Sequence, residues 1–526
     1  MKYLLTRPSR DVIEPLLDSL PNLFAGLKFP EPALLPVLAT ALQALEKTGG
    51  KIICSLATIP TWGPNRLVLR EDTKLYNTDK EKSLFKTENP AWRNIAGKMV
   101  EAGVGIDFFL TPSAYIDVAT IGHVSATTGG EMYLYPNFVL SRDIKKLGAE
   151  LSHTLHRQTG YQALMKVRCS TGLQVNSYHG NFLQTGSPAA DVEFGVVDED
   201  KAMCVMFSHD GKLDSKVDAH FQSALLYTTK SGERRVRCSN VVGAVTEIAR
   251  DAIRLADQDA VVSVLAREAA HKMLDKPLKE IRSALTEKCI EILAAYRKTA
   301  ATSGPPGQLV LPESLKEFAM FVLALLKTRA FRAGNVSSDL RVHSMRLLKS
   351  MSPADTSLYL YPRILPLHSL ADEDGFASPT GHLQLPAQVR ASFAFIEEGG
   401  VYLIDNGQFL LLWFHQHVSP NLLIDLFGPE HDTLASLDAM SPSPIPLLDT
   451  ALNAQVRNII QYLASLRGPK KLLIQLARQG LDGAEYEFAA NLVEDRNNEE
   501  RAYVDWLVHV HKYIQLEVSP AMRGGL

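Results

Sequence analysis

The sequence predicts a multidomain α+β protein in which four kinds of pattern follow one another. Helix and strand patterns alternate over residues 10–150, short strands with turns fill 161–240, helical periodicity covers 242–351, and a mixed pattern returns over 359–466. The chain has 526 residues, of which 46% are hydrophobic and 21% charged. This is ordinary globular composition, enough for roughly three or four domains.

The first pattern predicts a parallel α/β sheet, because strands alternate with helices that would cross over it. The expected helices are Asp11–Leu20, stopped by Pro21, then Leu34–Lys47, Pro90–Gly103 and a helical turn at Ile116–His123. The expected strands are Lys51–Leu56, Val104–Leu110 and Met132–Pro136.

The second pattern predicts a β-sandwich. Strands are expected around Val167–Arg168 and at Val192–Val197, Ala202–Ser208, Leu225–Thr229 and Arg235–Ser239. Ser231-Gly232-Glu233 separates the last two, so they form a hairpin.

The third and fourth patterns predict an all-helical domain and a small α/β domain. Helices are expected at Val242–Ala256, Ala260–Met273, Leu278–Ala300 and Leu315–Leu326, from their apolar spacing. The mixed region predicts strands Val401–Asp405, Phe409–Trp413 and Leu472–Gln475, helices Val418–Phe427 and Asn453–Arg467, and a last helix within Glu500–Val518.

Net charge, cysteine spacing and the length of apolar runs limit the classes of function that fit the sequence. The net charge of −3 gives no strong global field toward nucleic acid or anionic lipid. The five cysteines are scattered and form no Cys-x-x-Cys pair, which argues against a disulfide framework or a zinc site and favours a reducing compartment. No window holds eighteen uncharged apolar residues, so we expect any membrane role to be peripheral.

The sharpest candidate site lies in Met165–Leu173. Successive strand residues point to opposite sides, so Met165 and Val167 would face a core while Lys166 and Arg168 share the other face. Two cations two residues apart make a compact site for an acidic ligand. The alternative is a charged strand edge without a ligand.

A second candidate is a basic patch near the predicted hairpin. Arg234, Arg235 and Arg237 would add positive charge there, and a patch for phospholipid headgroups is one interpretation. Solvated strand charges are the other. No nucleophile elbow, phosphate loop or zinc-protease motif occurs, which weakens an α/β hydrolase or nucleotide-binding enzyme as the alternative function.

Six segments, in the right order along the chain, resemble the cargo-adaptor subunit of the COPII inner coat, the Sec24 family. They are Thr128-Gly129-Gly130 with Tyr133–Tyr135; Met165–Gly172, similar to the family's Met-Arg-Val-Arg-x-Ser-Thr-Gly; Leu225–Thr229 with Gly232–Arg235; Gln308–Glu313; Tyr361–Arg363 with Leu412-Trp413; and Leu492–Asp495 with Tyr503–Asp505 and His511-Lys512.

The resemblance implies a partial trunk related to von Willebrand A domains at 1–140, a β-sandwich at 141–241, a helical domain at 242–352, a gelsolin-like α/β domain at 353–485 and a C-terminal helical segment at 486–526. It further implies that the family's N-terminal region, four-cysteine zinc ribbon and first half of the trunk are absent from this chain. We therefore expect no cofactor or metal, and a trunk with an exposed sheet edge.

The resemblance also implies a function without catalysis: selection of cargo by export-signal binding during transport from the endoplasmic reticulum to the Golgi. The family's acidic-signal site maps onto Lys166 and Arg168, with Lys in place of the first Arg. Implied partners are a second inner-coat subunit through the trunk, cargo signals and SNAREs, an anionic membrane surface, and indirectly a small GTPase and the outer coat; nucleic acid is not one. The implied location is the cytoplasm, peripheral on the reticulum membrane and COPII vesicles. An actin-binding gelsolin-like protein is a further alternative.

Overall fold

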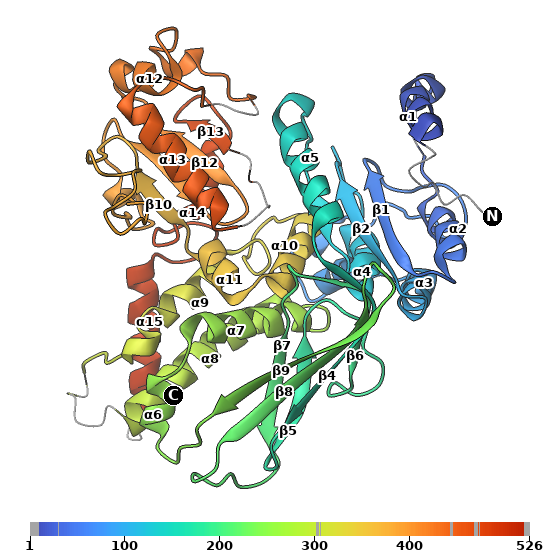
Figure 1. Cartoon of the computed structure of the whole chain (residues 1–526). Helices are drawn as coiled ribbons and strands as arrows, with labels where there is room; N and C mark the ends of the chain where they lie inside the picture. The colour runs from blue at the N-terminus through green and yellow to red at the C-terminus, as the bar shows by residue number, and fades with distance from the viewer. Residues whose placement is uncertain are drawn as a thin grey trace.

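The computed structural model describes residues 10–29, 31–300, 305, 307–441, 445–467, 472 and 474–519. Figure 1 shows an N-terminal α/β unit in blue and a β-sandwich in green below it. A helical layer in yellow-green leads to an orange α/β unit, and a red C-terminal helix lies against the helical layer. The multidomain α+β class predicted from the sequence is confirmed.

The N-terminal unit contains a three-stranded parallel sheet in the order β1-β2-β3. Its elements are α1 (Arg10–Phe24), α2 (Leu34–Leu45), β1 (Gly50–Leu56), the 3-10 turns η2 (Thr73–Leu75) and η3 (Glu81–Phe85), α3 (Pro90–Glu101), β2 (Val104–Leu110), α4 (Val118–Thr128) and β3 (Met132–Leu134). Every residue of β2 is buried, as a central parallel strand requires, and β1 lies at the edge.

Two helix predictions in this unit were wrong in extent. The first helix does not stop at Pro21 but continues to Phe24, with Pro15 and Pro21 inside it. No residue of α1 is buried, so water can bind the carbonyl oxygens that the prolines leave without a donor. The turn expected at 116–123 is the helix α4, which Asp117 caps by accepting the N–H of Thr120 and Gly129 ends at φ 78°.

The sandwich contains a four-stranded antiparallel sheet, β6-β4-β8-β9, and a two-stranded sheet, β5-β7. Helix α5 (Leu140–His156) leads into it, and the strands are β4 (Thr159–Cys169), β5 (Leu173–His179), β6 (Val192–Asp198), β7 (Cys204–His209), β8 (Ala219–Thr228) and β9 (Arg234–Gly243). The predicted hairpin is confirmed as β8–β9, whose turn places Gly232 at φ 89°. Strand β5 was not predicted, although Leu173 and Val175 alternate with polar residues as a strand's would.

The helical layer consists of α6 (Ala249–Arg254), α7 (Gln258–Lys272), α8 (Leu278–Thr299), the 3-10 turn η4 (Glu313–Leu315), α9 (Phe318–Lys327), α10 (Ser338–Ser350) and α11 (Pro353–Leu360). The helix expected over 242–256 was wrong in extent: Val242 and Gly243 complete β9 opposite His220 and Ala219, and only α6 is helical within that range. Pairing with β8 overrides the helical spacing of that segment.

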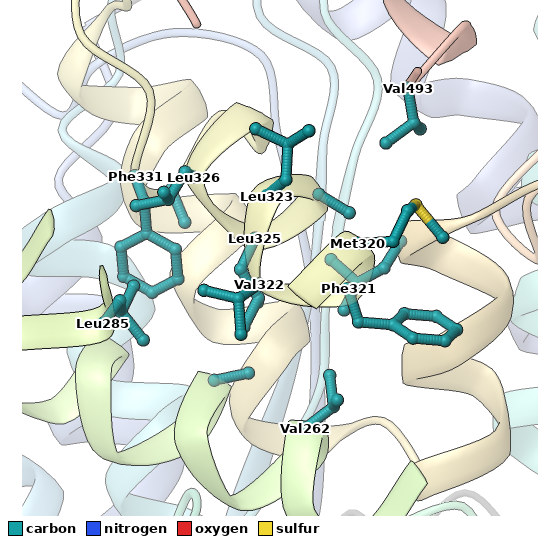
Figure 2. Packing of buried hydrophobic residues seen from close by; sticks show 14 of the residues in the cluster. Val262, Leu285, Met320, Phe321, Val322, Leu323, Leu325, Leu326, Phe331 and Val493 are labelled. Atoms are coloured by element: carbon teal, nitrogen blue, oxygen red, sulfur yellow. The ribbon is translucent and has the colours of Figure 1, made fainter. Parts of the chain in front are cut away.

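Helix α9 is the centre of the largest core, because all ten of its residues are buried. Figure 2 shows its side chains, including Val322 and Leu325, between Val262 of α7, Leu285 of α8 and Val493 of the C-terminal segment. At the end of α9, Lys327 Nζ donates to the Val493 carbonyl at 2.7 Å. None of the described helices combines the length and apolarity needed to cross a bilayer.

The last unit has a four-stranded sheet, β10-β11-β12-β13, with β12 and β13 parallel. Its elements are β10 (Arg363–Pro366), η5 (Phe393–Phe395), β11 (Val401–Asp405), β12 (Leu410–Phe414), α12 (Pro420–Phe427), η6 (Leu434–Ser436), α13 (Ala451–Ser465), β13 (Ile474–Arg478) and α14 (Glu485–Asn491). The strand predicted at 472–475 includes residue 473, which lies outside the described residues. Helix α15 (Tyr503–Val518) returns to the helical layer, where Trp506 Nε1 donates to the Ala319 carbonyl at 2.7 Å.

Candidate anion-binding site on the sandwich

Lys166 and Arg168 lie on the same exposed face of β4, where strand alternation places them. Met165 and Val167 point the other way and pack against the apolar interior of the sandwich. The two cations are therefore neither buried nor on separate surfaces. Their use in ligand binding stays a prediction.

A carboxylate of the same sandwich already contacts one of the two cations. Asp191 Oδ2 lies 3.1 Å from Lys166 Nζ, with 48% of the lysine side chain and 33% of the aspartate side chain exposed. Arg168 makes no ion pair or side-chain hydrogen bond with any residue in the described part of the chain. Arg168 is thus the cation of the pair that is available to a ligand.

One edge of β4 has no paired strand beside these two side chains. Strand β6 pairs with β4 only as far as Met165, whereas β8 continues to Cys169. Beyond Met165, the N–H of Val167 donates to the hydroxyl of Tyr178 at 3.2 Å instead of to a strand. Burial raises the pKa of Tyr178, so its hydroxyl stays neutral.

Strands β8 and β9 place small and polar side chains on the same face as Lys166 and Arg168. Ala224 of β8 lies opposite Lys166, and Gln222 lies opposite Arg168. Gln222 Nε2 donates to Asn240 Oδ1 of β9 at 2.9 Å, so the amides form a ladder next to the guanidinium. The motif located the two cations, but Asp191, Tyr178 and this ladder were missed, because only strand pairing brings them to Lys166 and Arg168.

The three arginines of the second candidate site divide between the two faces of β9. By alternation, Arg234 shares the face of Lys166, whereas Arg235 and Arg237 point to the opposite face. Arg234 donates to the Gln162 carbonyl at 2.7 Å, and Arg235 pairs with Glu233. A flat membrane surface that contacts Arg235 and Arg237 would therefore not contact Arg234, which lies on the other face of β9. Contact of these arginines with lipid stays a prediction.

A buried network of charges fixes the sandwich to the N-terminal unit and thereby positions β4. Arg157, just before β4, lies 3.2 Å from Asp107 of β2, 3.0 Å from Asp198 of β6 and 3.1 Å from Asp200. Burial alone would lower the pKa of Arg157, but the carboxylates of Asp198 and Asp107 outweigh it and raise the pKa. Arg157 is therefore charged at all ordinary pH values.

Glycines let the same two units approach at backbone distance. A Cβ on Gly195 of β6 would lie 2.2 Å from the carbonyl oxygen of Val104, and one on Gly105 would lie 2.1 Å from Val196 Cγ2. No side chain fits at either position without displacing backbone or a packed valine.

All five cysteines lie in the described part of the chain and are free. The described residues also contain no group of three His, Cys, Asp or Glu side chains placed to hold a metal ion.

Comparison with known proteins gives one consistent result. Family models match as the Sec23/Sec24 trunk domain at residues 4–155, the beta-sandwich domain at 160–246, the helical domain at 257–358 and a gelsolin repeat at 382–460. The chain is 34% identical over 519 residues to the human protein transport protein Sec24C, covering 97% of this chain and 46% of that protein. It is 33% identical over 511 residues to human Sec24D, covering 96% of this chain and 48% of that protein.

A plant relative and a solved structure agree with these matches. Arabidopsis thaliana SEC24 B is 32% identical over 514 residues, covering 97% of this chain and 46% of that protein. The crystal structure of the human COPII-coat protein Sec24c matches with a TM-score of 0.89 and 33% identity, covering 97% of this chain and 67% of that one. The chain spans about half the length of the curated relatives it matches.

Proposed function

This chain belongs to the Sec24 family, and from that premise we propose that it is a COPII coat subunit that selects cargo for transport from the endoplasmic reticulum to the Golgi. It would act by binding and not by catalysis. The observation that most supports this proposal is the match to the Sec24c structure over nearly the whole chain.

We place cargo-signal recognition at Lys166 and Arg168. The exposed guanidinium of Arg168, on the same face of β4 as Lys166, suits an extended peptide that carries a carboxylate. Lysine is a point charge and cannot make the two parallel hydrogen bonds of an arginine. Arg168 would therefore provide most of the carboxylate contact.

The partners proposed for the protein follow from the same family membership. They are a second inner-coat subunit bound through the trunk, cargo signals and SNAREs, an anionic membrane on which the protein is peripheral, and indirectly a small GTPase and the outer coat. Exposed apolar side chains of the trunk support a protein contact there, because such patches mark interaction sites. Trp62 is 63% exposed and Leu69 is 71% exposed.

The test is equilibrium binding of a fluorescent extended peptide that carries one glutamate. The double variant Lys166→Ala plus Arg168→Ala is expected to lose at least about tenfold in affinity, since one charge-assisted contact contributes about 1.5–3 kcal/mol. The matched control is Lys212→Ala plus Lys230→Ala, which removes the same charge from exposed positions elsewhere on the sandwich. Equal binding by the wild type and the Lys166/Arg168 variant would refute the site.

A further inference from the structure

The pair of cations presents less charge to a ligand than its sequence motif indicates. Lys166 is engaged by Asp191 at 3.1 Å, while Arg168 faces solvent without a partner in the described part of the chain. Together with Asp191, the two cations carry a net single positive charge. A second carboxylate arriving at Lys166 would have to displace Asp191 or lie beside it.

Backbone pairing around strand β6 determines the position of Asp191. Asp191 directly precedes Val192, the first residue of β6, which pairs with Met165 next to Lys166. The loop before it is closed by Leu183 and Glu193, which exchange two backbone hydrogen bonds of 2.9 Å each. The Gln184 side-chain amide also donates to the Ala190 carbonyl at 2.7 Å. The backbone that carries the carboxylate is thus held next to the lysine by these hydrogen bonds.

We infer that Asp191 is a specificity-determining residue that reduces the gain in affinity this site obtains from a second carboxylate on the signal; the inference rests on the proposed function. Residues i and i+2 of an extended peptide lie about 6.5–7 Å apart on one side, the same spacing as Lys166 and Arg168 on β4. A peptide with two such acids would match both cations if Lys166 were free. Asp191 occupies Lys166 and repels the second acid, so the second acid contributes little.

The inference is tested with two otherwise identical fluorescent peptides, one with a single glutamate and one with glutamates at positions i and i+2. Asp191→Asn removes the resident charge and keeps the side chain's shape. We expect the diacidic peptide to bind the variant about two- to fivefold more tightly than the wild type, as the measured strength of exposed ion pairs implies. The monoacidic peptide should change by less than about twofold.

A matched variant and the double variant separate the possible outcomes. Asp218→Asn makes the same change in net charge at an exposed residue of the sandwich without a side-chain partner in the described part of the chain. If Asp218→Asn raised diacidic binding as much as Asp191→Asn, the effect would be long-range and the inference would be overturned.

Two further results have different meanings. If Asp191→Asn left the ratio of the two affinities unchanged while Lys166→Ala plus Arg168→Ala abolished binding, the inference would fail and the proposed site would stand. If the double variant bound both peptides as the wild type does, the proposed site itself would fail.

Discussion

Arg157 is the residue whose loss should most weaken the attachment of the sandwich to the trunk. Its side chain is 1% exposed and lies between Asp107 of β2 and Asp198 of β6. Arg157→Met keeps much of the aliphatic length and removes the charge. Two buried carboxylates then lose a common partner, which is more costly than losing a surface ion pair.

The size of the loss follows from the cations that remain. Breaking a buried ion pair costs about 3–5 kcal/mol when one charge is left alone. Asp107 keeps Lys51 at 2.7 Å, whereas the next cation for Asp198 is Lys201 at 4.0 Å. Only one carboxylate is left poorly paired, so we expect about 3 kcal/mol, at the lower end of that range.

Urea denaturation followed by tryptophan fluorescence measures this change, with hydrogen exchange of β4 and β6 to assign it to the sandwich. Arg66→Met is the control, since Arg66 is exposed and has no ion pair in the described part of the chain. Adding Asp198→Asn to Arg157→Met should recover at least half of the loss. A loss below about 1 kcal/mol, or no recovery in the double variant, would refute the reasoning.

Two further predictions concern the same junction. Gly195→Ala places a Cβ 2.2 Å from the Val104 carbonyl oxygen and should lower the free energy of unfolding in urea by about 1–3 kcal/mol. Gly243→Ala is the control and should be near neutral, because nothing lies within 4 Å of the added Cβ. Equal effects of the two substitutions would contradict the close approach of the two backbones. Burial alone would raise the pKa of Glu131, but the nearby charge of Lys201 outweighs burial and lowers the pKa. A lowered pKa in the folded state means that the stabilisation is present above the ordinary glutamate value of 4.5 and is lost as pH falls below it. Glu131→Gln should therefore flatten the fall of the urea midpoint between pH 4.5 and 3, and an unchanged slope would show that Glu131 is not responsible.

Local patterns predicted most elements because each depends on near neighbours in the sequence. The alternation around Lys166 placed it with Arg168 on one face, and Gly232 marked the hairpin turn. The apolar spacing of Leu315–Leu326 predicted a helix, and all of α9 is buried. Prediction failed where distant pairing decides, as at Val242, which has helical spacing but belongs to β9.

By itself, the sequence determined the four-part architecture and the face on which the two cations project, since periods of two and 3.6 residues are properties of contiguous chain. Tertiary structure alone decided that Asp191 neutralises Lys166 and that Arg234 is separated from Arg235 and Arg237. It also decided that Arg157 joins carboxylates from two domains. These are contacts between residues that only strand register and domain docking bring together, and no local pattern encodes which partner a charge will meet.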